Sequence, residues 1–243
     1  MKKLLIVLMG LLLGTSAWAQ KQSEGNITAE YLLDLSNLGL FTPGSGQPYS
    51  LFNSAVRARY FLHDDLAVRV HLGVNGMSQT ENYAENSDGT GGKGSRVAKT
   101  NQVTFGLGVE KHFEGNDRLS PFVGFEFLLQ SRSASEKWDK FDGSGYNANY
   151  TRTVSGQATV NGNSYNKTSS FGAGLYAGFD YYFLENVYIG TEFNLGFTSG
   201  KTGEVTDEVN ISGTPNKTVT PEGKTGGFST SAVGYFRLGF ILK

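Results

Sequence analysis

The 243 residues carry 21 basic and 22 acidic side chains, so the formal net charge of −1 does not favour nucleic acid as a partner. The chain has no cysteine, which excludes disulfides, thiolate metal sites, a cysteine nucleophile and a lipid-modified cysteine anchor. Beyond the N-terminal region, no segment is long and apolar enough to predict a membrane-spanning helix.

Residues 1–19 have the form of a cleaved export signal. Two lysines precede an apolar run over residues 4–13, which is too short for a stable membrane-spanning helix. Ala17 and Ala19 then occupy the positions of an A-x-A cleavage site, so we expect cleavage directly after Ala19. A retained membrane anchor is the alternative. Residues 20–243 are expected to form a single domain.

Eight later segments alternate residue by residue between apolar and polar side chains, which is the period of a β-strand with two unlike faces. The pattern is clearest in the third segment, where one side consists of Leu66, Val68, Val70, Leu72 and Val74. In chain order, the expected strands cover residues 27–35, 54–62, 66–75, 102–113, 119–130, 169–183, 187–197 and a last segment that ends at the C-terminus.

The connections between these segments alternate between long and short. Tight turns are expected at residues 63–65, 114–117 and 184–186. Polar loops are expected after the first strand and over residues 78–99, 131–167 and 198–226. This alternation predicts an all-β fold, an eight-stranded antiparallel up-and-down barrel with its short turns and both termini at one end.

Alternation alone does not show which face of these strands meets lipid, since a soluble barrel with an apolar interior has the same pattern. The positions of the charges decide between the two. The apolar face carries a single charge, Lys111, near a strand end. The polar face carries Glu30, Asp34, Arg57, Arg59, Arg69, Glu110, Glu126, Asp180, Glu192 and Arg237, together with many glycines. A water-exposed sheet usually includes lysine, whereas arginine with carboxylates suits an enclosed network of paired charges. We therefore predict a transmembrane β-barrel whose narrow lumen is filled by these side chains.

The histidines and acidic turns do not form a recognisable reaction centre. His71 is expected to point inward and to join the charge network by hydrogen bonding. His63 and His112 lie near short turns, and no G-x-S-x-G motif is present. Residues 86–89 and 139–143 resemble calcium loops but lack the full ligand spacing and the closing glutamate. We therefore expect no catalytic residue, no cofactor and no metal, and a protein that is not an enzyme.

The closing strand of the chain supports a family resemblance. It reads Tyr235-Phe236-Arg237-Leu238-Gly239-Phe240-Ile241-Leu242-Lys243, with an inward arginine. With the eight-strand topology and the inward Arg/Glu pairs, the chain resembles the small OmpA/OmpX-like barrels of the outer membrane protein beta-barrel domain family. The resemblance implies a bacterial outer membrane location, both termini in the periplasm, contact with outer-membrane lipid and assistance from the barrel-assembly machinery. Lys243 departs from the terminal aromatic residue of the family's assembly signal.

The resemblance implies no shared catalytic motif, so the function is left to the loops and the lumen. One hypothesis is a structural or surface-interaction protein that contacts an envelope or surface partner through the long loops. The loop aromatics Trp138, Tyr146, Tyr150 and Tyr165 suit such contacts. The alternative is a narrow porin-like channel for ions or small solutes, and a lipid-modifying outer-membrane enzyme is a third hypothesis.

Overall fold

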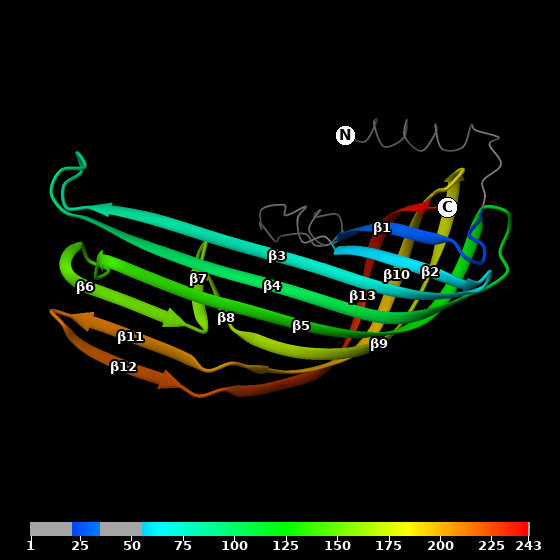
Figure 1. Cartoon of the computed structure of the whole chain (residues 1–243). Coiled ribbons are helices and arrows are strands. Elements are labelled where there is room, and N and C mark those ends of the chain that lie inside the picture. Colours follow the sequence, from blue (N-terminus) through cyan, green and yellow to red (C-terminus); the bar gives the residue numbers. More distant parts are fainter. Residues whose placement is uncertain (1–20, 35–54, 243) are drawn as a thin grey trace.

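In the computed structural model, the regular elements of the described residues are all β-strands (Figure 1). The structure describes the backbone of residues 21–34 and 55–242, and the side chains of residues 21–31, 56–224 and 237–242. The predicted export signal and the connection after the first strand lie outside these residues. Within them, no helix has the length and apolar character needed to cross a membrane.

Eight of the strands form a closed hydrogen-bonded ring. They are β1 (Ile27–Asp34), β2 (Ala55–His63), β3 (Leu66–Ala84), β4 (Lys93–His112), β5 (Leu119–Phe141), β9 (Thr168–Leu184), β10 (Val187–Thr202) and β13 (Gly223–Leu242). Each strand pairs antiparallel with the next one of the ring in chain order. β13 closes the ring on β1, with Leu242 opposite Ile27. The predicted all-β antiparallel architecture is therefore confirmed.

The two ends of the ring differ. The turns at residues 64–65, 113–118 and 185–186 are short, and they lie at the same end as the start of β1 and the finish of β13. We call this the short-turn end. The opposite end is the origin of a large extension, so the connections differ in size between the two ends of the ring.

The prediction of long loops over residues 78–99, 131–167 and 198–226 is wrong, because most of these residues are in strands. β3, β4 and β5 continue well past the ring. Three further strands join this extension at the edge of β5: β6 (Tyr146–Ser155), β11 (Val205–Ile211) and β12 (Thr214–Thr220). Together they form what we call the projecting sheet, which extends far from the ring in Figure 1. β7 (Gln157–Val160) and β8 (Asn163–Asn166) form a separate hairpin.

Alternation of apolar and polar residues does not reveal the projecting sheet, because its outward face is polar. On β5, Ser131, Ser133 and Ser135 follow the apolar outward position Leu129. Backbone hydrogen bonds hold such strands together whichever side chains they carry. The hydrophobic pattern therefore marks only the part of each strand that needs an apolar surrounding.

Within the ring, the outward side chains are apolar and largely exposed, while the inward side chains are buried and include many charged groups beside a few apolar ones such as Phe61 and Phe122. Leu72 on β3, Leu107 on β4 and Leu175 on β9 are examples of the outward class. A water-soluble barrel has the opposite arrangement, with its apolar side chains in the interior. A continuous apolar outer surface of this size normally marks contact with a partner or a membrane.

Candidate functional site

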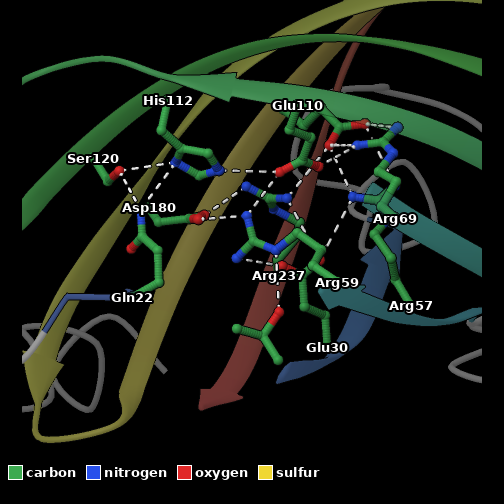
Figure 2. Close-up of polar contacts among 12 residues, drawn as sticks. Gln22, Glu30, Arg57, Arg59, Arg69, Glu110, His112, Ser120, Asp180 and Arg237 are labelled. Carbon is green, nitrogen blue, oxygen red and sulfur yellow. Dashed lines mark hydrogen bonds and ion pairs between the residues drawn. The ribbon is translucent and has the colours of Figure 1, made fainter. Parts of the chain in front are cut away.

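The ring encloses a cluster of arginines and carboxylates, which Figure 2 shows in close-up. The structure brings nine of the predicted residues together here, none more than 5% exposed. They are Glu30, Arg57, Arg59, Arg69, Glu110, Glu126, Asp180, Glu192 and Arg237, and we call them the buried network. The predicted member His71 lies at its edge, with Nδ1 3.4 Å from Glu126 Oε1. The side chain of Asp34 lies outside the described residues.

Arg59 on β2 contacts three carboxylates of the buried network. Its Nη2 lies 2.8 Å from Glu30 Oε1 and donates a hydrogen bond to the Tyr188 hydroxyl at 2.6 Å. Its Nη1 lies 2.9 Å from both Glu110 Oε2 and Asp180 Oδ2. A single guanidinium group thus contacts carboxylates from three strands, β1, β4 and β9, and ties them together across the lumen.

Glu192 on β10 has a similar role for the opposite charge. Its Oε2 accepts hydrogen bonds from Arg57 Nη1 at 2.8 Å and from Arg69 Nη1 at 3.0 Å. Nη1 of Arg237 lies 3.5 Å from the same oxygen. Arg237 also donates to Asp180 Oδ1 at 2.5 Å. Each arginine of the network shares at least two carboxylates with other arginines, so removal of one residue disturbs several pairs.

One carboxylate of the network explains how two neighbouring arginines are tolerated side by side. Arg59 on β2 and Arg69 on β3 are directly opposite in the register, a position where like charges repel. Glu110 on β4 bridges them, because its Oε2 is 2.9 Å from Arg59 Nη1 and its Oε1 is 3.0 Å from Arg69 Nη1. The arginine pair and the carboxylate therefore act as one unit, and none of the three is expected to be replaceable alone.

At the short-turn end of the ring, the structure buries a polar residue that the sequence analysis did not predict. Gln22 precedes β1, yet its side chain is buried and its Nε2 donates to Ser120 Oγ at 3.0 Å (Figure 2). Its Oε1 accepts a hydrogen bond from the Tyr182 hydroxyl. Ser120 Oγ lies 2.9 Å from His112 Nδ1, and His112 Nε2 lies 3.3 Å from Glu110. This Ser–His–Glu chain is buried beneath Gln22 and therefore continues the network rather than facing a substrate.

Two inward glycines make room for tyrosine rings inside the ring. A Cβ atom added to Gly239 on β13 would overlap the ring of Tyr188, and one added to Gly124 on β5 would overlap the ring of Tyr176. The Tyr188 hydroxyl donates to Glu30 Oε1 at 2.6 Å, so the tyrosine that packs over Gly239 also hydrogen-bonds to the buried network. Glycine on the inward face is therefore required by close packing at these positions.

At the other end of the ring, the β7–β8 hairpin lies on the continuation of the lumen wall. Ala158 and Val160 of the hairpin pack against Ala98 of β4 and Ala134 of β5. The guanidinium group of Arg132 lies over the ring of Tyr165 on β8. The hairpin therefore covers the inward face of the sheet just beyond the ring.

Glu136 on β5 anchors the hairpin. Its Oε1 accepts hydrogen bonds from Arg96 Nε at 2.8 Å and Trp138 Nε1 at 2.6 Å, and its Oε2 accepts from the Thr159 N–H at 3.0 Å. Burial alone would raise the pKa of Glu136, but the Arg96 and Thr159 hydrogen bonds outweigh burial and lower this pKa. Sequence alone did not indicate this residue, because Arg96 and Thr159 come from distant segments.

We expect Glu136→Gln to loosen the hairpin while leaving the ring intact. The amide removes the charge that Arg96 pairs with and cannot accept at both ends. Hydrogen exchange at the backbone amides of residues 157–166 should accelerate, with little change in β9 and β10. Because the folded pKa of Glu136 is lowered, its stabilisation is present above its unfolded pKa and is lost as the pH falls through the folded value. Unchanged exchange in the hairpin would contradict this anchoring role.

Of the loop aromatics predicted to contact a partner, Trp138, Tyr146 and Tyr150 lie on strands of the projecting sheet, and Tyr165 lies on β8 of the hairpin. Tyr83 and Phe141 stack with ring centroids 3.5 Å apart, and Trp138 and Phe141 stack with centroids 5.3 Å apart. The guanidinium groups of Arg96 and Arg152 lie over the Trp138 ring. These rings therefore stiffen the sheet. In the part of the chain with described side chains, no group of three or more His, Cys, Asp or Glu could hold a metal ion.

A comparison with protein families identifies the family of this chain. The model of the OmpA-OmpF-like porin family matches residues 52–197, which is more than half of the chain. The chain belongs to this family. A comparison with curated proteins found no match. OmpA-OmpF-like porins are outer-membrane proteins, and the all-β ring is consistent with an outer-membrane β-barrel. Family membership thus indicates a membrane protein rather than an enzyme.

Proposed function

We propose that the ring spans the outer membrane as an eight-stranded up-and-down barrel. The observation that carries this proposal is the inverted arrangement of its side chains, with apolar residues outside and the buried network inside. On β9 the outward residues from Phe171 to Tyr181 are apolar. At about 3.3 Å per residue this run is roughly 33 Å long, and at a tilt near 40° it covers roughly 25 Å, the height of a membrane-barrel apolar band.

The same proposal gives the ring a filled lumen and a structural role. The buried network occupies the middle, Gln22 is buried and hydrogen-bonded at the short-turn end, and the β7–β8 hairpin covers the inward face at the opposite end. An eight-stranded barrel has an interior about wide enough for its own side chains. The projecting sheet then takes the role that the sequence analysis gave to the loops. Through it the protein would contact a partner at the cell surface or in the envelope. The barrel-assembly machinery would act on β13, the closing strand.

We expect the purified protein to form no stable pore in planar lipid bilayers. The close ion pairs of the buried network leave no wide path for hydrated ions, because each charged group is already held by partners from other strands. Single-channel recording should show no steady conductance on the nanosiemens scale. Steady conductance at that level would favour the second candidate, a narrow porin-like channel, which the family name supports.

We expect the projecting sheet to face the cell exterior and the short turns to face the periplasm. The chain has no cysteine, so a single introduced cysteine reports its own position. Ser87→Cys lies in the turn between β3 and β4, and Asp117→Cys lies in a short turn. A membrane-impermeant maleimide added to intact cells should label the first variant and not the second until the outer membrane is opened. The reverse result would invert the proposed orientation.

A further inference from the structure

Three lysines gather on the outward face of neighbouring strands, at the end of the ring from which the projecting sheet extends. Lys201 on β10 is directly opposite Lys224 on β13 in the register. Lys167 immediately precedes β9, and its carbonyl accepts a hydrogen bond from the Gly203 N–H just after β10. We call Lys167, Lys201 and Lys224 the lysine patch.

The lysine patch carries more positive charge than its neighbours balance. Lys201 Nζ lies 3.0 Å from Glu222 Oε2, with both side chains 54% exposed. No carboxylate among the described side chains forms an ion pair with Lys167 or Lys224, which are both exposed. Two lysines directly opposite each other in a sheet repel. Such a pair is stabilised when an anion binds between the two ammonium groups.

We call the apolar outward residues of the ring the apolar band. The lysine patch lies at a defined distance from this band along the strands. On β10 the outward positions after Phe197 are Ser199 and then Lys201. On β9 the outward positions before Phe171 are Ser169 and then Lys167. The lysines thus stand four residues from the last aromatic residue of the band, roughly 13 Å along the strand. A lysine stem of this length can extend along the barrel surface toward the polar boundary of a membrane.

From these observations we propose that the lysine patch binds the headgroup phosphates of an anionic lipid in the outer leaflet. The proposal rests on the membrane-spanning ring proposed above. The exposed rings of Phe171 and Phe197 would lie against the acyl chains of the same lipid, while Ser169 and Ser199 offer hydroxyl donors between the two regions. A free phosphate ion lacks the apolar part, and the open, one-sided patch gives it little enclosure. A bound lipid therefore fits better than a free ion.

Binding of diphosphorylated lipid A to the folded protein in detergent micelles tests this inference. The patch variant is K167Q/K201Q/K224Q, and the matched control is K93Q/K137Q/K217Q, which removes the same charge from lysines on the projecting sheet. Each lysine near a phosphate-bearing surface contributes a factor of roughly five, so the patch variant should bind about 100-fold more weakly. The control should bind as the unmodified protein does. Binding should also weaken as salt rises.

The other arms of the experiment separate the remaining explanations. Inorganic phosphate at matched ionic strength should not displace lipid A, and phosphatidylcholine should not replace it. Equal binding by the patch variant and the control would overturn the inference, as would displacement by inorganic phosphate. If the unmodified protein inserts into vesicles but binds both lipids alike, only the lysine patch inference fails. If it does not insert, the proposed membrane span fails as well.

Discussion

Replacement of Arg59 by alanine is expected to destabilise the folded ring by about 3–5 kcal/mol, because it leaves buried carboxylates without their partner. Arg59 contacts Glu30, Glu110 and Asp180 within 3 Å, and none of these carboxylates is more than 2% exposed. Arg59→Lys should recover part of the loss, since a single ammonium group restores the charge but not the contacts made by two guanidinium nitrogens.

Urea titration of folding into lipid vesicles would measure these differences. Lys217→Ala is the matched control, because it breaks the exposed ion pair between Lys217 and Glu208 on the projecting sheet. Exposed pairs contribute little, so the control should unfold at the same urea concentration as the unmodified protein. An Arg59→Ala variant as stable as the control would show that the buried network does not hold the ring together.

Replacement of Leu175 by arginine is expected to cost about 2–4 kcal/mol if this side chain lies near the membrane midplane, where a lipid-facing cation loses its hydration. Leu175 is 59% exposed on the outside of β9, between the outward residues Ala173 and Ala177. The same folding titration in vesicles measures the effect. An arginine introduced at Ser133 on the projecting sheet serves as the control, because this outward position lies beyond the apolar band.

The Leu175→Ala variant distinguishes a membrane-spanning barrel from a soluble one. In lipid the smaller side chain should cost little, because acyl chains fill the space. A leucine in a soluble protein core loses about 2–5 kcal/mol on the same change. A large penalty for Leu175→Ala, together with folding in water without lipid or detergent, would show that the apolar face does not meet a membrane.

Much of the ring is determined by the sequence itself, because strand faces are a local property. Side chains alternate across a strand, so the order of residues places Leu72 and Arg69 on opposite faces before any partner is known. The absence of lysine among the inward charges indicated an enclosed interior, and the structure places Arg57, Arg59, Arg69 and Arg237 inside the ring. The family match agrees with the resemblance that these residues suggested.

The contacts between distant segments were decided only by the tertiary structure. Glu110 lies 41 residues from Arg69, and Gln22 lies 98 residues from Ser120, so no local pattern pairs them. The sequence analysis did not predict the projecting sheet for a related reason. Its polar strands are held by backbone hydrogen bonds and show no alternation of apolar and polar residues. The lysine patch likewise exists because strand register brings Lys201 opposite Lys224. Periodicity assigns a side chain to a face, whereas its partners depend on how the ring closes.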